Sequence, residues 1–268
     1  MKSFAKILTL VLSVLLLTAC FTGCQPKEEE KNVLKVATNA EFPPFESLEN
    51  GEYVGFDVEL IQLIAEKLEM TVEFSNMEFE AVLGAITSGT CDVGISGLTI
   101  NEKRRLSVDF SDPYYTSYQI VLAAASNGAF TATNKEEMDL QLVGKKIGVC
   151  SGYTGVAYVE GDEEAGYPGI ADADVRIYDN LSLAILDLKN GNIDAIVMDD
   201  VPARAAAATQ ENKDAVKVFN IPLTTEEYGI ALRKGNTVLA EKVNKALKEL
   251  KDEGKIDELL ERWISVVE

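Results

Sequence analysis

The sequence predicts an α/β fold of two similar lobes, each built on a mostly parallel sheet. Short apolar runs alternate along the chain with segments in which apolar residues recur at helical spacing. Runs such as Val93–Ile95 and Ile193–Met198 are typical of strands buried on both faces, as parallel strands are. The chain has 268 residues and 47% hydrophobic content, which is enough to bury a large core in one or two domains.

An internal repeat supports the interpretation as two lobes. Residues 83–95 and 185–197 share one frame, in which a helical segment is followed by Gly, two residues, Asp and a buried strand. Five residues after the shared Asp, the first copy reaches Gly97 and the second reaches Asp199. Both lie just past the carboxyl end of a strand, where open α/β sheets bind ligands. Chance similarity remains an alternative, because the helix–turn–strand unit is common.

In the first half, local signals predict two strands, a hairpin and two helices. Two prolines after the first strand stop it and stiffen a loop that would present Phe42 and Phe45. Asp57 is expected to cap the first helix, and Gly89 to end the second. The expected elements are strand Val33–Thr38, a tight turn at Asn50–Gly51, a helix from Asp57 to Leu68, strand Thr71–Phe74 and helix Phe79–Ser88.

The second half repeats this alternation. A glycine-rich loop, Ser151–Gly155, follows a strand and opens a helix. The expected strands are Lys146–Cys150, Val175–Tyr178, Ile193–Met198 and Tyr228–Leu232. The expected helices are Leu181–Lys189, Pro202–Ala208, Val238–Leu250 and Ile256–Ile264.

The N-terminus has the pattern of a secretory signal over residues 1–19. Two lysines precede an apolar run from Ile7 to Leu17, which is too short to span a membrane as a mature helix. Leu17–Cys20 resembles a bacterial lipobox, in which Cys20 is acylated; Cys24 is a weaker second candidate because an aromatic residue stands where lipoboxes prefer Leu. Residues 20–32 are then expected to be a solvated tether, so that lipid holds the protein at the membrane.

Charge and composition exclude several classes of function. The formal net charge is −19, and it becomes −21 once the two lysines of residues 1–19 are removed, so the chain repels nucleic acid and anionic lipid. The absence of histidine excludes imidazole-based catalysis and removes the commonest metal ligand, and no cofactor is expected. Cys91 and Cys150 lie singly in strand-like runs and are expected to be buried free thiols.

Residues 94–115 place a fixed positive charge at an expected loop. Arg104 and Arg105 follow Gly97 and Thr99, and a guanidinium forms a planar fork that matches the two oxygens of a carboxylate. The alternative is a solvated charged run, the usual reading for at least one of two adjacent arginines. Asp199 leaves a buried strand and could hold an ammonium group, although it could equally cap the following helix, as Asp200 could.

The motif Gly97-x-Thr99 followed by Arg104, and then Asp109-Phe110-Ser111 before Pro113-Tyr114-Tyr115, is similar to the amino-acid-binding extracytoplasmic solute receptors of ABC importers. The resemblance runs from about Leu34 to Trp263. It implies a type II periplasmic-binding-protein-like fold with two hinge strands. Lobe I would comprise residues 33–115 and 228–268, lobe II residues 119–223, with connections near 114–118 and 224–228.

The same resemblance implies roles for individual residues. Arg104 and Thr154, helped by Thr99 and the Gly97 backbone, would grip the carboxylate of an α-amino acid, and Asp199 would hold its α-amino group. Phe42 and Phe79 would enclose the side chain, although Phe79 taken alone could equally be a core residue. The full set of expected ligand-binding residues is Asn39, Phe42, Phe79, Ser96, Gly97, Thr99, Arg104, Cys150, Tyr153, Thr154 and Asp199.

Three residues depart from the pattern of the family. Asn39 stands where many relatives that take lysine or arginine have Asp, Cys150 where they often have a polar or basic residue, and Tyr153 where Thr or Ser is usual. Negative charge near the cleft could still come from Glu41, Glu78 or Asp200. The ligand is therefore expected to be a polar amino acid, neutral or basic, such as glutamine, arginine or lysine.

The expected protein is a monomeric, lipid-anchored receptor on the extracytoplasmic face of a bacterial cell membrane, delivering its amino acid to an importer permease. It is not expected to be an enzyme. The alternative on the same fold is a dehydratase acting on prephenate or arogenate, but no carboxylate is marked by the sequence as its general acid. A sensor domain is a second alternative, disfavoured because no second membrane segment is expected.

Overall fold

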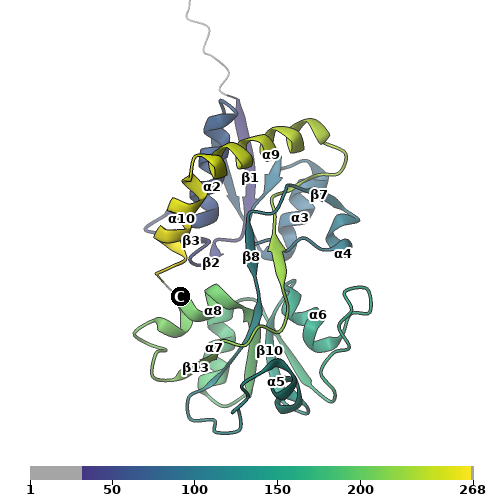
Figure 1. The fold of residues 1–268 in the computed structure, drawn as a ribbon, viewed down its shortest axis with the longest axis vertical. Coiled ribbons are helices and arrows are strands. Elements are labelled where there is room, and N and C mark those ends of the chain that lie inside the picture. Colours follow the sequence, from purple (N-terminus) through teal and green to yellow (C-terminus); the bar gives the residue numbers. More distant parts are fainter. Residues whose placement is uncertain (1–31, 267–268) are drawn as a thin grey trace, which may run out of the picture. The chain divides into compact units, whose positions relative to one another are not determined.

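The computed structural model describes residues 32–266 as two α/β lobes joined by extended strands (Figure 1). The expected signal peptide and the candidate lipidation sites Cys20 and Cys24 lie outside the described residues, as does the tether apart from Asn32. None of the helices in the described part of the chain has the length and apolar character needed to cross a membrane.

The first lobe is built on a five-stranded sheet of order β5-β1-β6-β15-β7. Its strands are β1 (Val33–Thr38), β5 (Thr71–Asn76), β6 (Val93–Gly94), β7 (Val108–Phe110) and β15 (Ala231–Arg233). Its helices are α2 (Phe56–Lys67), α3 (Phe79–Ser88), α4 (Glu102–Arg105), α9 (Thr237–Asp252) and α10 (Lys255–Trp263). A small antiparallel sheet adds β2 (Glu41–Phe42), β3 (Glu46–Glu49) and β4 (Glu52–Val54).

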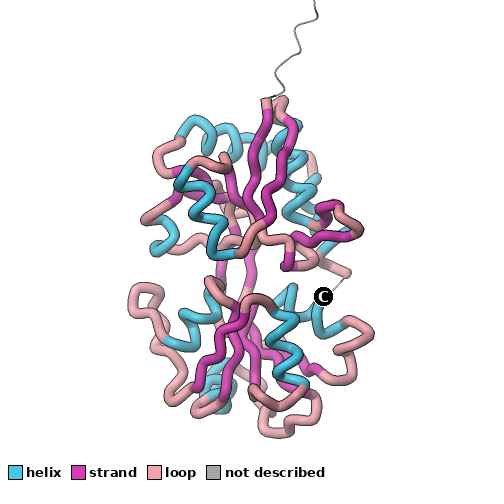
Figure 2. The backbone as a smooth tube through the Cα atoms, turned by 180° about the vertical axis from the view of Figure 1, so that it is seen from behind, coloured by secondary structure: helices cyan, strands magenta, loops and turns pink. Residues whose placement is uncertain are grey.

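The second lobe repeats this plan, with helices around a central sheet (Figure 2). Its five strands have the order β11-β10-β12-β9-β13. Its strands are β9 (Gln119–Ala124), β10 (Lys146–Cys150), β11 (Asp174–Tyr178), β12 (Ala195–Asp199) and β13 (Val216–Phe219). Its helices are α5 (Lys135–Leu142), α6 (Thr154–Glu160), α7 (Leu181–Lys189) and α8 (Asp200–Ala208).

Each sheet buries apolar side chains on both faces, because successive residues of a strand point to opposite sides. In β1, Leu34 and Val36 pack in the core that includes α2, α9 and α10, whereas Ala37 packs with α3. In β12, Ile196 packs with α7 and α8, whereas Val197 belongs to the core on the other face. The apolar runs of the sequence are therefore two-sided strands, as predicted.

Two strands, β8 (Tyr115–Ser117) and β14 (Glu226–Tyr228), form an antiparallel pair that joins the lobes (Figure 1). In each five-stranded sheet, four strands run in one direction and one runs against them. The opposed strands, β9 and β15, are the ones that follow β8 and β14 along the chain. The chain thus crosses twice between lobes and enters each lobe at an equivalent place.

Most of the expected elements are confirmed. Strands Val33–Thr38 and Lys146–Cys150 and helices Phe79–Ser88 and Leu181–Lys189 have the predicted bounds. The turn at Asn50–Gly51 joins β3 to β4, with both residues at positive φ, as a tight hairpin requires.

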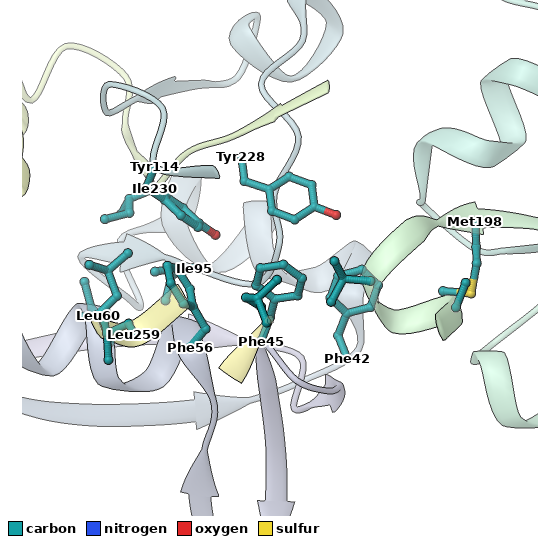
Figure 3. Close-up of a cluster of buried hydrophobic side chains, with 14 of the residues drawn as sticks. Phe42, Phe45, Phe56, Leu60, Ile95, Tyr114, Met198, Tyr228, Ile230 and Leu259 are labelled. Atoms are coloured by element: carbon teal, nitrogen blue, oxygen red, sulfur yellow. The ribbon is translucent and has the colours of Figure 1, made fainter. Parts of the chain in front are cut away.

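Three local predictions are wrong. The Asp57 side chain does not cap α2, which begins after Gly55; it is turned into the protein interior. Phe45 is not presented by its loop but is fully buried, with its ring 5.4 Å from that of Tyr228 (Figure 3). The strand expected over residues 228–232 is two strands in different sheets, β14 and β15, because the chain passes there from the hinge into the first lobe.

Candidate functional site

A cavity of about 1070 Å³ is lined by residues of both lobes and of the hinge. Five of the expected ligand-binding residues line it, namely Phe79, Thr99, Arg104, Tyr153 and Thr154. The hinge contributes Glu226, which the sequence analysis did not identify. The sequence around it carries no signal of this role: the structure alone shows that Glu226 and Tyr228 are buried on the inward face of an extended segment while Glu227 between them is exposed.

Arg104 lies on α4, immediately after the strand-end loop of the first lobe. Asn101 caps this short helix by accepting from the Arg104 N–H at 2.8 Å, which fixes the start of the Arg104 side chain. One guanidinium nitrogen donates to the Thr99 carbonyl at 2.8 Å and the other to the Gly152 carbonyl of the second lobe at 3.0 Å. The guanidinium also lies 5.3 Å from the centre of the Phe79 ring.

The electrostatics of Arg104 are those of a buried cation. Only 9% of the residue is exposed, and burial lowers the pKa of the guanidinium, while the nearby carboxylates of Glu226 and Asp199 act to raise it. Neighbouring Arg105 is instead exposed and lies 3.7 Å from Glu102. The two adjacent arginines therefore have different environments, and only Arg104 faces the cavity.

Asp199 is the last residue of β12 and is 4% exposed. Its side chain makes no capping hydrogen bond to α8; it accepts from the Tyr228 hydroxyl at 2.5 Å. Burial, followed by the charge of Glu226, raises the pKa of Asp199 to about 7. Asp200 is engaged elsewhere, with Arg204 at 2.7 Å and the Ser117 hydroxyl at 3.0 Å.

The hydroxyls of Thr99 and Thr154 meet at one carboxylate. Both donate to Glu226 Oε2 at 2.7 Å, and Thr224 donates to Oε1 at 3.0 Å. Thr154 also accepts from the Gln119 side-chain amide at 3.2 Å. The two threonines expected to contact a ligand carboxylate thus lie side by side, one from each lobe.

Three aromatic rings form a row beside the cavity. The Tyr153 ring lies 5.4 Å from that of Phe42 and 4.6 Å from that of Phe79. Phe42 is 5% exposed, and Figure 3 shows it next to Phe45 in the aromatic core. Gly152 has φ +75°, and a Cβ there would stand 2.8 Å from Glu80 and 3.1 Å from Phe79, so the glycine lets this loop approach α3 closely.

The remaining first-lobe candidates lie in a buried polar cluster. Asn39 is 6% exposed and its side-chain amide donates to the Met77 carbonyl at 3.0 Å, while the Ser96 hydroxyl accepts from the Asn39 N–H and donates to Glu46. The Gly97 N–H, expected to be accessible to a ligand, is instead buried and donates to Asp57 Oδ2 at 2.8 Å. The inward-turned Asp57 therefore takes the donor that the Gly97 backbone was expected to offer to a ligand carboxylate.

Glu46 and Asp57 form a fully buried pair of acids. Burial raises the pKa of Asp57 to about 6 and that of Glu46 well above its ordinary value, where the neighbouring Asp57 charge adds to the effect. Among the described residues, Glu46 Oε2 and Asp57 Oδ1 have no other hydrogen-bond partner, and a proton held between the carboxyls satisfies both. Tyr114 completes the cluster by donating to Asp57 at 2.8 Å.

Both cysteines of the described chain are free and buried, as predicted. Cys150 ends β10 at 1% exposure, and burial, with the nearby charge of Asp199, raises the pKa of its thiol to about 12. The thiol therefore stays protonated at neutral pH and contributes a small apolar group beside Asp199.

The sequence is similar to a known family of proteins over most of its length. The model of the bacterial extracellular solute-binding proteins, family 3, matches residues 34–266. A probable histidine-binding protein of Neisseria gonorrhoeae is 32% identical over 96% of this chain and 93% of its own. The arginine-binding extracellular protein ArtP of Bacillus subtilis strain 168 is 31% identical over 99% of both chains.

Solved structures give the same result. An ancestral arginine-binding protein bound to arginine has 40% sequence identity and a TM-score of 0.77, with 87% of this chain and 98% of the other covered. The structure of an ancestral arginine-binding protein bound to glutamine has the same identity and coverage, with a TM-score of 0.75. The type II periplasmic-binding-protein fold is therefore confirmed.

Proposed function

The chain belongs to the bacterial extracellular solute-binding proteins of family 3, which makes it an amino-acid-binding receptor of ABC transport, and we propose that its ligand is a polar L-amino acid, neutral or basic. Arg104 and the two threonines would receive the α-carboxylate, and Asp199 the α-ammonium group. Phe42 and Phe79 would enclose the side chain, with Asn39, Ser96, Cys150 and Tyr153 completing the site. An importer permease would receive the ligand.

The observation that carries this proposal is the pairing of opposite charges in a buried setting. Arg104 of the first lobe and Asp199 of the second are both less than a tenth exposed, and the Asp199 charge acts to raise the pKa of Arg104. A zwitterion offers the complementary pair of charges. A ligand of about ten heavy atoms reaches micromolar affinity, about −8 kcal/mol, only if nearly every atom is engaged, which favours enclosure between lobes. Closure about the two hinge strands would provide it.

Two features bear on the class of side chain. Asn39 is neutral, which suits glutamine or another polar neutral amino acid. Against this, the relatives named above are described as histidine- or arginine-binding, and one ancestral structure holds glutamine. The proposal therefore keeps both the neutral and the basic class, with glutamine, arginine and lysine as the first candidates.

The test is calorimetric titration of the mature chain with each of the twenty L-amino acids, after thermal-shift screening. At least one polar amino acid should bind with a dissociation constant in the micromolar range or below, and the corresponding D-amino acid should bind at least tenfold more weakly. Failure of all twenty would contradict the proposal. The matched relatives are named as binding proteins, which favours a receptor over the dehydratase alternative; prephenate should give no phenylpyruvate absorbance.

We further propose that the receptor is a monomer held at the extracytoplasmic face of the cell membrane by lipid on Cys20. The residues before Cys20 match a lipobox better than those before Cys24. Cys20→Ser should release the protein from membranes, whereas Cys24→Ser should not. Intact-mass data showing acylation at Cys24 would reverse this assignment.

A further inference from the structure

The hinge strand β14 carries two buried polar side chains that bond residues of the proposed site. Glu226 and Tyr228 are separated by one residue, so both point to the same side of the strand, and both are buried while Glu227 between them is exposed. The Tyr228 hydroxyl donates to Asp199, the residue proposed to hold the ligand's ammonium group. In Figure 3 the phenol oxygen of Tyr228 points toward the side on which Phe42 and Met198 lie.

Glu226 engages the opposite end of the site in the same way. A single oxygen, Oε2, accepts from Thr99 of the first lobe and from Thr154 of the second, each at 2.7 Å. The Glu226 charge is also the largest of the charges that act to raise the pKa of buried Arg104. A carboxylate of the chain itself is therefore bonded to the groups proposed to receive the carboxylate of an amino acid.

A threonine hydroxyl cannot donate its proton to Glu226 and to the carboxylate of a ligand at the same time. Each threonine hydroxyl has one proton, and both protons are directed at Glu226. A second carboxylate approaching either hydroxyl would meet oxygen lone pairs and the negative charge of Glu226. Full engagement of the amino acid by Thr99 and Thr154 thus requires that Glu226 release them.

We propose that Glu226 is an internal competitor for the α-carboxylate of the ligand, and that it lowers the affinity for amino acids by holding Thr99 and Thr154. This inference rests on the proposed function. Because the carboxylate belongs to the hinge and bonds one threonine from each lobe, it also links the lobes. When the ligand binds, its α-carboxylate replaces that of Glu226 as the acceptor for the two threonine hydroxyls. Arg104 carries the positive charge near this exchange.

The test compares ligands with and without the α-carboxylate charge. L-Arginine and L-argininamide differ only in carboxylate against neutral carboxamide, and L-glutamine and its α-amide form a second pair. Glu226→Gln removes the charge but keeps an acceptor oxygen for the threonines. The pair to use is the one whose amino acid the wild-type chain binds. Glu226→Gln should bind that amino acid about tenfold more tightly than the wild-type chain does, while its affinity for the corresponding amide should change less than twofold.

Glu241→Gln is the control, because it makes the same change of charge at an exposed glutamate of α9, which does not line the cavity. It should change neither affinity by more than twofold. Glu226→Asp keeps the charge on a shorter side chain that cannot reach both threonines, and it should give a smaller gain than Glu226→Gln. This second variant also covers the case in which Glu226→Gln unfolds, as measured by its thermal transition.

The outcomes separate the two proposals. If the wild-type chain binds an amino acid but Glu226→Gln binds it equally or more weakly, with an unchanged ratio of amino acid to amide, Glu226 is a supporting residue and the inference is overturned alone. If neither the wild-type chain nor any variant binds any amino acid, the proposed function is overturned and the inference with it.

Discussion

The two lobes share one framework and differ in the chemistry at its edge. In the first, Asp92 Oδ2 accepts from the Lys35 N–H at 3.0 Å; in the second, Asp194 Oδ2 accepts from the Lys146 N–H at 2.9 Å. The glycine three residues before each Asp has positive φ, +80° at Gly89 and +73° at Gly191. The internal repeat therefore encodes a turn after a helix and a clamp between two parallel strands.

Beyond the clamp the lobes diverge. The chain after β6 gives Ser96 and Gly97, both bonded to buried acids, and reaches Arg104 on α4. In the second lobe β12 itself ends at Asp199, and α8 begins at the next residue. Equivalent strand ends therefore supply a cation from one lobe and an anion from the other. Repetition explains the framework, and the departures from it mark the proposed binding residues.

The largest effect expected is loss of binding when either charge is removed. Arg104→Ala or Asp199→Asn should weaken amino-acid binding by about 2–5 kcal/mol, because each leaves a desolvated charge of the ligand unpaired. Arg104→Lys should also weaken binding, since it loses the planar fork. Calorimetric titration measures the loss.

Arg105→Ala is the control, because Arg105 carries the same charge on the exposed side of the same short helix. It should leave affinity within about twofold. Near-unchanged affinity in Asp199→Asn would reject the placement of the ammonium group in the second lobe, and with it the division of charge between the lobes.

The next effect concerns the buried acids that hold Gly97 in the first lobe. With a pKa of about 6 in the folded protein and about 3.9 when unfolded, Asp57 takes up a proton on folding at pH values between these two. The stability it contributes is present below about pH 4 and is lost as the pH rises through about 6. The free energy of unfolding of the wild-type chain, relative to Asp57→Asn, should therefore fall by about 2–3 kcal/mol between pH 4 and pH 8.

Urea unfolding at pH 4, 6 and 8 measures this difference. Asparagine can still accept from Gly97 and Tyr114, so the variant should keep the cluster intact. Asp112→Asn, at an exposed aspartate, should follow the pH dependence of the wild-type chain. The same dependence in all three proteins would show that no proton is held between Glu46 and Asp57 in this range.

The sequence predicted what short-range signals determine. Gly89 ends α3 where expected, and the hairpin at Asn50–Gly51 and the helix Leu181–Lys189 have the predicted bounds, because caps, turns and periodicity lie within a few residues. Contacts between distant residues were not predictable in this way. Asp57 resembled a helix cap but bonds Gly97, 40 residues away, and Glu226 bonds Thr99 across 127 residues.

The third effect concerns the side chain of the ligand. The strand pairings make Asn39 and Cys150 equivalent residues of the two lobes, since Val36 pairs with Val93 as Ile147 pairs with Ala195. Asn39→Asp should raise the affinity for arginine relative to glutamine by about tenfold or more, because a charge-assisted hydrogen bond contributes about 1.5–3 kcal/mol. Taking the ratio within one variant cancels the cost of losing the bond to Met77.

Ser151→Asp adds the same charge just past β10 in the second lobe and should change that ratio less. If the two variants change the ratio equally, the new charge acts at long range and Asn39 has no special place. If Asn39→Asp leaves the ratio unchanged, Asn39 does not face the side chain of the ligand.

The smallest effect tests the shared framework itself. Asp92 and Asp194 are both half-buried, and each accepts from one backbone N–H of the neighbouring strand. Their own N–H groups each donate back at 2.8 Å, to Lys35 and Lys146 respectively. Asp92→Ala and Asp194→Ala should each lower the free energy of unfolding by about 1 kcal/mol, the usual net contribution of such a bond, and should leave amino-acid affinity within about twofold.

Chemical denaturation and calorimetry of the two variants measure these quantities side by side. Equal losses of stability with unchanged affinity would mean that the clamp stabilises both lobes in the same way and has no part in ligand binding. A loss of affinity confined to Asp194→Ala would instead tie the second clamp to Asp199, which lies five residues further along the chain at the end of β12. The comparison of the lobes would then fail, since their frameworks would no longer be equivalent.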